Sequence, residues 1–79
     1  MRLILATPAD TISTAVEWVE LMIEDGSIII KPGHAPALFA LQDNTPIVFR
    51  LPSGSEHTRI VQRGLASVER TGVTVIVDE

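Results

Sequence analysis

The chain has 79 residues, 46% of them hydrophobic, and its six basic and ten acidic residues give a net charge of −4. This composition is too apolar for a disordered segment, and the length suits one small domain, residues 1–79. Basic residues do not cluster anywhere, which excludes direct binding to nucleic acid or to an anionic membrane. The absence of cysteine excludes disulfides and thiolate zinc sites.

The first residues, 1–6, form a short apolar run that ends at Thr7-Pro8. The run is too short for a cleavable signal or a membrane-spanning segment. We therefore expect a cytoplasmic protein that does not insert into lipid.

The segment from Ile12 to Ile23 gives conflicting signals. Its apolar residues follow helical spacing, Thr14 and Glu17 are spaced as a capping box, and Gly26 is placed as a C-terminal cap. These local rules favour a helix. Residues 15–21 are nevertheless rich in the β-branched and aromatic residues typical of strands, and the period alone does not decide between the two.

The second half of the chain predicts β-hairpins. Residues 46–51 and 58–62 are two β-prone runs separated by the turn signal Ser53-Gly54-Ser55. Residues 65–70 and 73–77 flank a Thr71-Gly72 turn, and the period-2 rule places Val73, Val75 and Val77 on one face. Turn signals recur along the whole chain at the spacing of an all-β sandwich or barrel.

The most specific pattern is residues 31–38, which read KPGHAPAL. This string resembles the PGHAPL signature of F-type ATP synthase epsilon subunits, called delta in mitochondria. The Thr7-Pro8 turn, residues 16–21 (VEWVEL), residues 63–68 (RGLASV) and residues 73–78 (VTVIVD) resemble, in the same order, other segments of that family's N-terminal domain. The resemblance covers nearly the whole chain.

The resemblance implies an all-β fold, a flattened β-sandwich of about ten short, mostly antiparallel strands. It also implies that residues 15–23 run extended, against the local helical pattern. The family continues into a C-terminal helical hairpin that regulates ATP hydrolysis, whereas this sequence stops at Glu79. No inhibitory or nucleotide-sensing role is carried over.

The function implied is that of a non-catalytic rotor subunit of F1Fo ATP synthase, which couples the gamma subunit to the membrane c-ring. The implied location is peripheral, on the cytoplasmic side of the bacterial inner membrane, as part of F1. The expected partners are the gamma subunit and the c-ring, with no nucleic acid, no small-molecule substrate and no cofactor. Two segments are expected at these interfaces, and their residues are Gly26, Ser27, Pro32, Gly33, His34, Ala35 and Pro36.

Within the first segment, Gly26 and Ser27 match the family's loop at the c-ring, although Ser27 replaces an acidic residue and Ile29 a glycine. A plain hairpin turn also explains Gly26. His34 lies in a loop stiffened by Pro32 and Pro36, and is read either as a gamma contact or as an ordinary turn histidine.

Other interpretations remain open at this stage. Trp18 is either a core anchor or an interface residue, with the core favoured, and Phe39 and Phe49 are expected in the core. Lys31 is the single lysine, which raises a stand-alone binding module or a biotinyl or lipoyl carrier as the alternative function. Spacings for a metal site, a nucleophile elbow and a P-loop are all missing, so catalysis is not expected.

Overall fold

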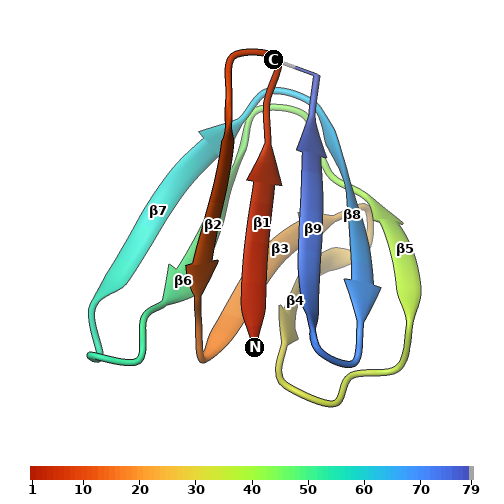
Figure 1. Ribbon diagram of the computed structural model, residues 1–79. Helices are drawn as coiled ribbons and strands as arrows, with labels where there is room; N and C mark the ends of the chain where they lie inside the picture. Colours follow the sequence, from red (N-terminus) through yellow and green to blue (C-terminus); the bar gives the residue numbers. More distant parts are fainter. Residues whose placement is uncertain (79) are drawn as a thin grey trace.

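A computed structural model describes residues 1–78, and these residues form nine β-strands in two sheets (Figure 1). No helix occurs in this part of the chain, and hence none that is long and apolar enough to span a bilayer. The strands are β1 (Arg2–Ala6), β2 (Thr11–Ala15), β3 (Trp18–Ile23), β4 (Gly26–Ile30), β5 (Ala37–Ala40), β6 (Thr45–Arg50), β7 (Glu56–Val61), β8 (Gly64–Glu69) and β9 (Gly72–Val77).

The two sheets have the strand orders β2-β1-β9-β8-β5 and β4-β3-β6-β7. All neighbouring strands are antiparallel except β1 and β9, which run parallel with Leu3 opposite Val73 and Leu5 opposite Val75. The prediction of a mostly antiparallel β-sandwich is confirmed. The strand count is nine against the expected ten or so, with one further isolated bridge between Ile23 and Leu41.

The core lies between the sheets and is made by alternate residues of the strands. In β9, for example, Val73, Val75 and Val77 are buried while Ile76 is exposed, as the period-2 rule requires. Among residues 1–78, fourteen hydrophobic residues are buried: Leu3, Leu5, Val16, Val19, Leu21, Ile30, Leu41, Ile47, Val61, Ala66, Val68, Val73, Val75 and Val77.

Residues 15–23 are extended, as the resemblance implied, and the helical pattern was misleading. The chain forms β2 in one sheet, bends at Val16 and Glu17, and enters β3 in the other sheet. Inward-facing residues recur every two positions within each strand, but the bend places the buried Val16 and Val19 three positions apart. The apolar residues of the two strands together therefore imitate the helical period of 3.6. Within β3 the true alternation is clear, since Val19 and Leu21 are fully buried.

Both predicted hairpins are present. β6 and β7 pair from Thr45–Val61 to Arg50–Glu56, and β8 and β9 pair from Gly64–Val77 to Glu69–Gly72. Gly72 has a further requirement, because a Cβ there would lie 2.3 Å from the Arg2 carbonyl oxygen of β1. β1 can therefore pair with β9 in this register only if position 72 is glycine.

The expectation that Trp18 is a core anchor was wrong. Trp18 is only half-buried, because it precedes the fully buried Val19 in β3 and so faces the outside of its sheet. Phe39 and Phe49 are also half-buried, but they do pack against the core.

We predict that Leu21→Ala lowers the free energy of unfolding by about 2 to 5 kcal/mol, because it removes a fully buried side chain and leaves a cavity. Urea unfolding followed by circular dichroism measures this change. Leu38→Ala is the matched control, since Leu38 is 71% exposed and its loss should cost under about 0.5 kcal/mol. Equal losses for the two variants would contradict the assignment of the core.

Candidate subunit interface

The loop from Lys31 to Pro36 connects β4 of one sheet to β5 of the other at the end of the sandwich where the N-terminus lies (Figure 1). It begins with a tight turn in which the His34 N–H donates to the Lys31 carbonyl at 3.2 Å. Pro32 occupies the second position of this turn and Gly33, with a φ of 86°, the third. This arrangement is typical of a type II turn, which favours both residues.

Two further hydrogen bonds hold the loop in place. The Gly33 N–H donates to the Arg70 carbonyl in the β8–β9 turn at 3.0 Å. The Nδ1 of His34 lies 2.7 Å from the Ala35 carbonyl oxygen, which accepts when Nδ1 carries the proton. The imidazole is half-buried, whereas Pro32, Gly33, Ala35 and Pro36 are exposed. The loop is therefore a preformed, accessible surface.

Gly26 and Ser27 lie at the opposite end of β4 from this loop. Gly26 has a φ of 124° directly after the Glu24-Asp25 turn, and Ser27 is exposed and paired with Met22 of β3. The strand between the two segments has five residues, so it separates them by roughly 17 Å. The structure thus presents the predicted residues as two separate surfaces, one at each end of the domain.

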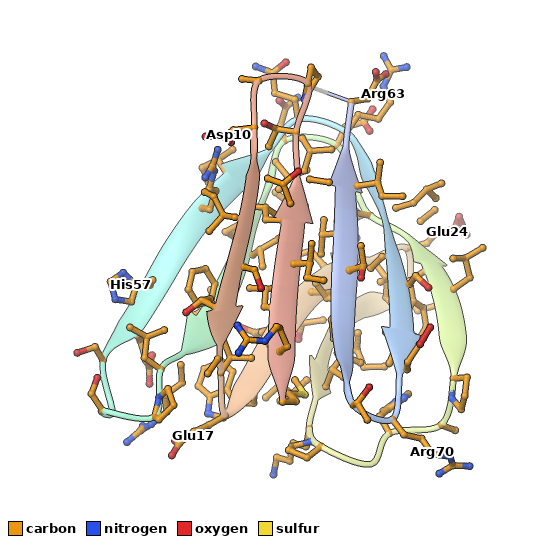
Figure 2. All side chains as sticks on the ribbon, viewed as in Figure 1. Asp10, Glu17, Glu24, His57, Arg63 and Arg70 are labelled. Carbon is orange, nitrogen blue, oxygen red and sulfur yellow. The ribbon has the colours of Figure 1, made fainter. Side chains whose placement is uncertain are left out.

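The two ends differ in charge. Lys31 and Arg70 are exposed beside the His34 loop, and Arg2 is tied to the same end by its N–H, which donates to the Thr71 carbonyl. At the other end, Glu24 and Asp25 form the turn before Gly26. Figure 2 shows Arg70 and Glu24 at these two places.

A third acidic residue, Asp43, joins the end that carries Gly26. It lines a hollow of about 430 Å³ together with Glu24. The neighbouring Gln42 connects the β5–β6 turn to β3 through two hydrogen bonds. Its backbone N–H donates to the Met22 carbonyl oxygen at 2.9 Å, and its side-chain amide N–H donates to the Ile23 carbonyl oxygen. Glu24, Asp25 and Asp43 were not identified as a group from the sequence, since nothing local shows that the β3–β4 and β5–β6 turns lie together.

An exposed apolar surface on the outer face of one sheet was not located from the sequence. It extends from Leu38, two residues after Pro36 of the His34 loop, to Leu65 and Ile76, which line a hollow with Asp43 at the other end of the domain. Its three residues, Leu38 of β5, Leu65 of β8 and Ile76 of β9, are 71%, 49% and 55% exposed and face outward from one sheet. Leu65 and Ile76 are direct cross-strand partners, and Leu38 pairs with Ser67 two positions from Leu65. We call Leu38, Leu65 and Ile76 the outer apolar patch.

Comparison with known proteins identifies the fold and the loop together. Residues 1–79 match the family model for the β-sandwich domain of the ATP synthase delta/epsilon chain. The chain belongs to this family. That membership explains the KPGHAPAL loop and argues against the carrier-domain alternative raised by Lys31.

Curated relatives of this delta/epsilon-type domain include the ATP synthase epsilon chains of Corynebacterium urealyticum and Corynebacterium diphtheriae, which are 35% and 33% identical over 54 residues. The matched segment covers 68% of this chain but 44% of each relative. The chain therefore spans less than two thirds of the length of these relatives.

Among solved structures, a chain of the Tetrahymena thermophila mitochondrial ATP synthase, in its central stalk and c-ring structure, superposes with a TM-score of 0.84 at 16% identity. The superposition covers 100% of this domain and 63% of that chain. At this identity the match establishes the β-sandwich fold.

We predict that Gly33→Ala destabilises the delta/epsilon-type domain by about 1 to 2 kcal/mol, because an L-residue at a φ of 86° is strained even though no atom lies within 4 Å of the added Cβ. Chemical denaturation measures the change. Gly33→Asn should cost less, because asparagine tolerates this conformation better than alanine. An alanine variant as stable as the original would show that the loop relaxes freely.

Proposed function

We propose that this domain is a non-catalytic part of the central stalk of F1Fo ATP synthase, where it couples the gamma subunit to the c-ring during ATP synthesis and ion transport. The observation that carries the proposal is the match of residues 1–79 to the delta/epsilon β-sandwich domain. The KPGHAPAL segment also supports the proposal, because its loop is exposed and ends at the exposed Leu38.

The gamma subunit is the partner proposed for the end of the domain that carries His34. The rim of this contact would be formed by Pro32, Gly33, His34, Ala35 and Pro36, with Leu38 of the outer apolar patch at its centre. Burying exposed aliphatic side chains such as Leu38 provides the main free energy for a permanent contact. The fixed turn lowers the entropic cost, because the loop is already ordered before binding.

The c-ring is the partner proposed for the other end, through Gly26 and Ser27. The acidic side chains of Glu24, Asp25 and Asp43 surround this contact and favour a partner surface that carries positive charge. Ser27 stands where the family usually has an acidic residue. It would contribute a hydroxyl to the c-ring contact, while Glu24 and Asp25 would supply the negative charge.

The architecture suits a part that transmits force instead of carrying out chemistry. The strands run between the two ends of the domain, and each is hydrogen-bonded to at least one neighbour (Figure 1). A load applied at the Gly26 end reaches the His34 end through the five residues of β4 and the ladder that pairs β4 with β3. As a rotor part, the domain would sit peripherally on the cytoplasmic side of the bacterial inner membrane within F1.

We predict that the domain co-purifies with the cognate gamma subunit when the two are expressed together, and that Leu38→Glu weakens the complex at least tenfold. The substitution places a charge in the centre of the proposed contact, where desolvation is most costly. Isothermal titration calorimetry with the purified subunits measures the affinity.

Ile29→Glu serves as the control for this experiment, because Ile29 is 48% exposed on the outer face of the other sheet and should leave gamma binding unchanged. Failure to co-purify with gamma would overturn the proposal. So would equal loss of affinity in the two variants, since binding would then not be specific to the outer apolar patch.

A further inference from the structure

One flank of the sandwich is open, between β2 at the edge of one sheet and β7 at the edge of the other (Figure 1). Inward-facing positions on these two strands are not covered. Ile12 of β2 is paired with the buried Leu5 and so faces inward, yet it is 40% exposed. In β7 every residue except Val61 is exposed. The two sheets therefore leave inward-facing positions uncovered along this side of the domain.

Arg59 occupies an inward-facing position of β7 at this open flank. It is paired with Ile47 of β6, which is 1% exposed, and it lies two residues from the buried Val61 on the same face of the strand. An arginine among these inward-facing residues is unusual, because the inward-facing positions beside it, such as Ile47 and Val61, are apolar. The ion pairs found within residues 1–78 join Arg50 to Glu17 and Glu56, and Arg63 to Asp78, so Arg59 has no carboxylate partner there.

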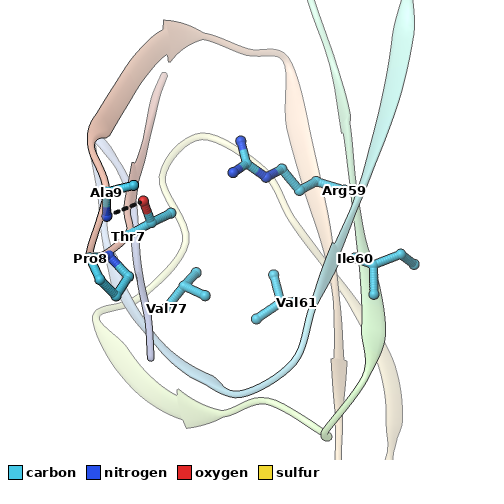
Figure 3. A pocket seen from close by; sticks show the side chains of 7 residues that line it. All are labelled: Thr7, Pro8, Ala9, Arg59, Ile60, Val61 and Val77. Atoms are coloured by element: carbon cyan, nitrogen blue, oxygen red, sulfur yellow. Dashed lines mark hydrogen bonds between the residues drawn. The ribbon is translucent and has the colours of Figure 1, made fainter. Parts of the chain in front are cut away.

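The guanidinium of Arg59 borders a pocket of about 250 Å³ between β7 and the β1–β2 turn. Figure 3 shows Arg59 and Val61 pointing into this pocket and Ile60 pointing away. The opposite wall is formed by Pro8, Ala9 and Val77. The turn is held in shape by Thr7, whose hydroxyl oxygen accepts from the N–H groups of Ala9 and Asp10 at 3.2 and 3.1 Å.

The outer edge of β7 is available for backbone pairing. Within the described residues, β7 pairs with β6 on one side and with no strand on the other. Such an edge presents unpaired N–H and C=O groups that can accept another extended chain. Ile60, which is 62% exposed on the outward face, adds apolar surface along the same edge.

We propose that the β7 edge is a docking surface for an extended segment of a partner protein that carries an acidic residue and an aliphatic residue two positions apart. The segment would add a strand beside β7. Its carboxylate would then face Arg59, and its aliphatic side chain would enter the pocket beside Val61 and Val77. Charge complementarity selects the acidic residue, and the period-2 geometry of strands fixes the spacing. This surface is distinct from the His34 loop and from the Gly26 turn.

The experiment uses the whole 79-residue chain and a fluorescein-labelled, end-blocked heptapeptide with the sequence Thr-Leu-Thr-Glu-Thr-Val-Thr. Fluorescence anisotropy should give a Kd on the order of 100 μM, typical of a short, weakly held peptide. Replacing Glu by Gln in the peptide should weaken binding about fivefold, and Arg59→Gln should do the same. Combining the two changes should add little more, because they remove the same interaction.

Three controls make the test specific. Arg70→Gln removes an exposed arginine at the far end of the domain and should leave binding unchanged. Arg59→Glu should bind a lysine-substituted peptide better than the original one. A peptide with N-methylated backbone amides on the edge-pairing side should bind at least tenfold more weakly, because it cannot complete the strand.

Two results would overturn the proposal: absence of binding at millimolar peptide, or binding that neither Arg59→Gln nor the N-methylated peptide weakens. Gamma co-purification, measured in parallel with Arg59→Gln, separates this surface from the proposed rotor contact. If the domain binds the peptide but does not co-purify with gamma, the docking surface is supported and the proposed rotor contact is not. Loss of gamma co-purification in Arg59→Gln would contradict the independence of the two surfaces.

Discussion

The whole structure depends on one constraint, which is that a chain this short can bury only alternate residues of its strands. Two sheets packed face to face satisfy the constraint by placing residues such as Val19, Ile47 and Val75 in a single shared layer. The remaining positions of each strand must face outward. That geometry explains why a domain with so many apolar residues still exposes Leu38 and Ile76, and why its outer faces and edges are suited to contacts with other proteins.

Much of the fold could be predicted from the sequence, and the failures have physical causes. The hairpins β6–β7 and β8–β9 are local, so their turns and alternation were visible in the chain. The β2–β3 region was read correctly only through the family resemblance, because a bend between two strands imitates helical spacing. Trp18 was wrongly placed in the core because its size favours burial. Adjacent residues of a strand face opposite sides of the sheet, and since Val19 faces the core, Trp18 faces outward.

The candidate interface was predicted in part. The loop around His34 carries a distinctive pattern, and the structure shows it exposed and held by the Gly33–Arg70 hydrogen bond. The acidic end formed by Glu24, Asp25 and Asp43 was missed, as was the open flank at Arg59. Both arise from strands that are distant in sequence and become neighbours only through the strand order of the sheets. Local pattern reasoning has no access to such proximity, and the roles of these surfaces remain proposals.

The position of β9 has a consequence for how the domain is made in the cell. β9 lies between β1 and β8 in its sheet, so the first strand of this domain is joined to the rest of its sheet, apart from β2, only by the last strand of the domain. Until residue 77 emerges, Leu3 and Leu5 have no neighbours at positions 73 and 75 to pack beside. The apolar segments of β1 to β8 must therefore be kept from aggregating until β9 has been synthesised, and the domain should complete its folding in one cooperative step once β9 is available.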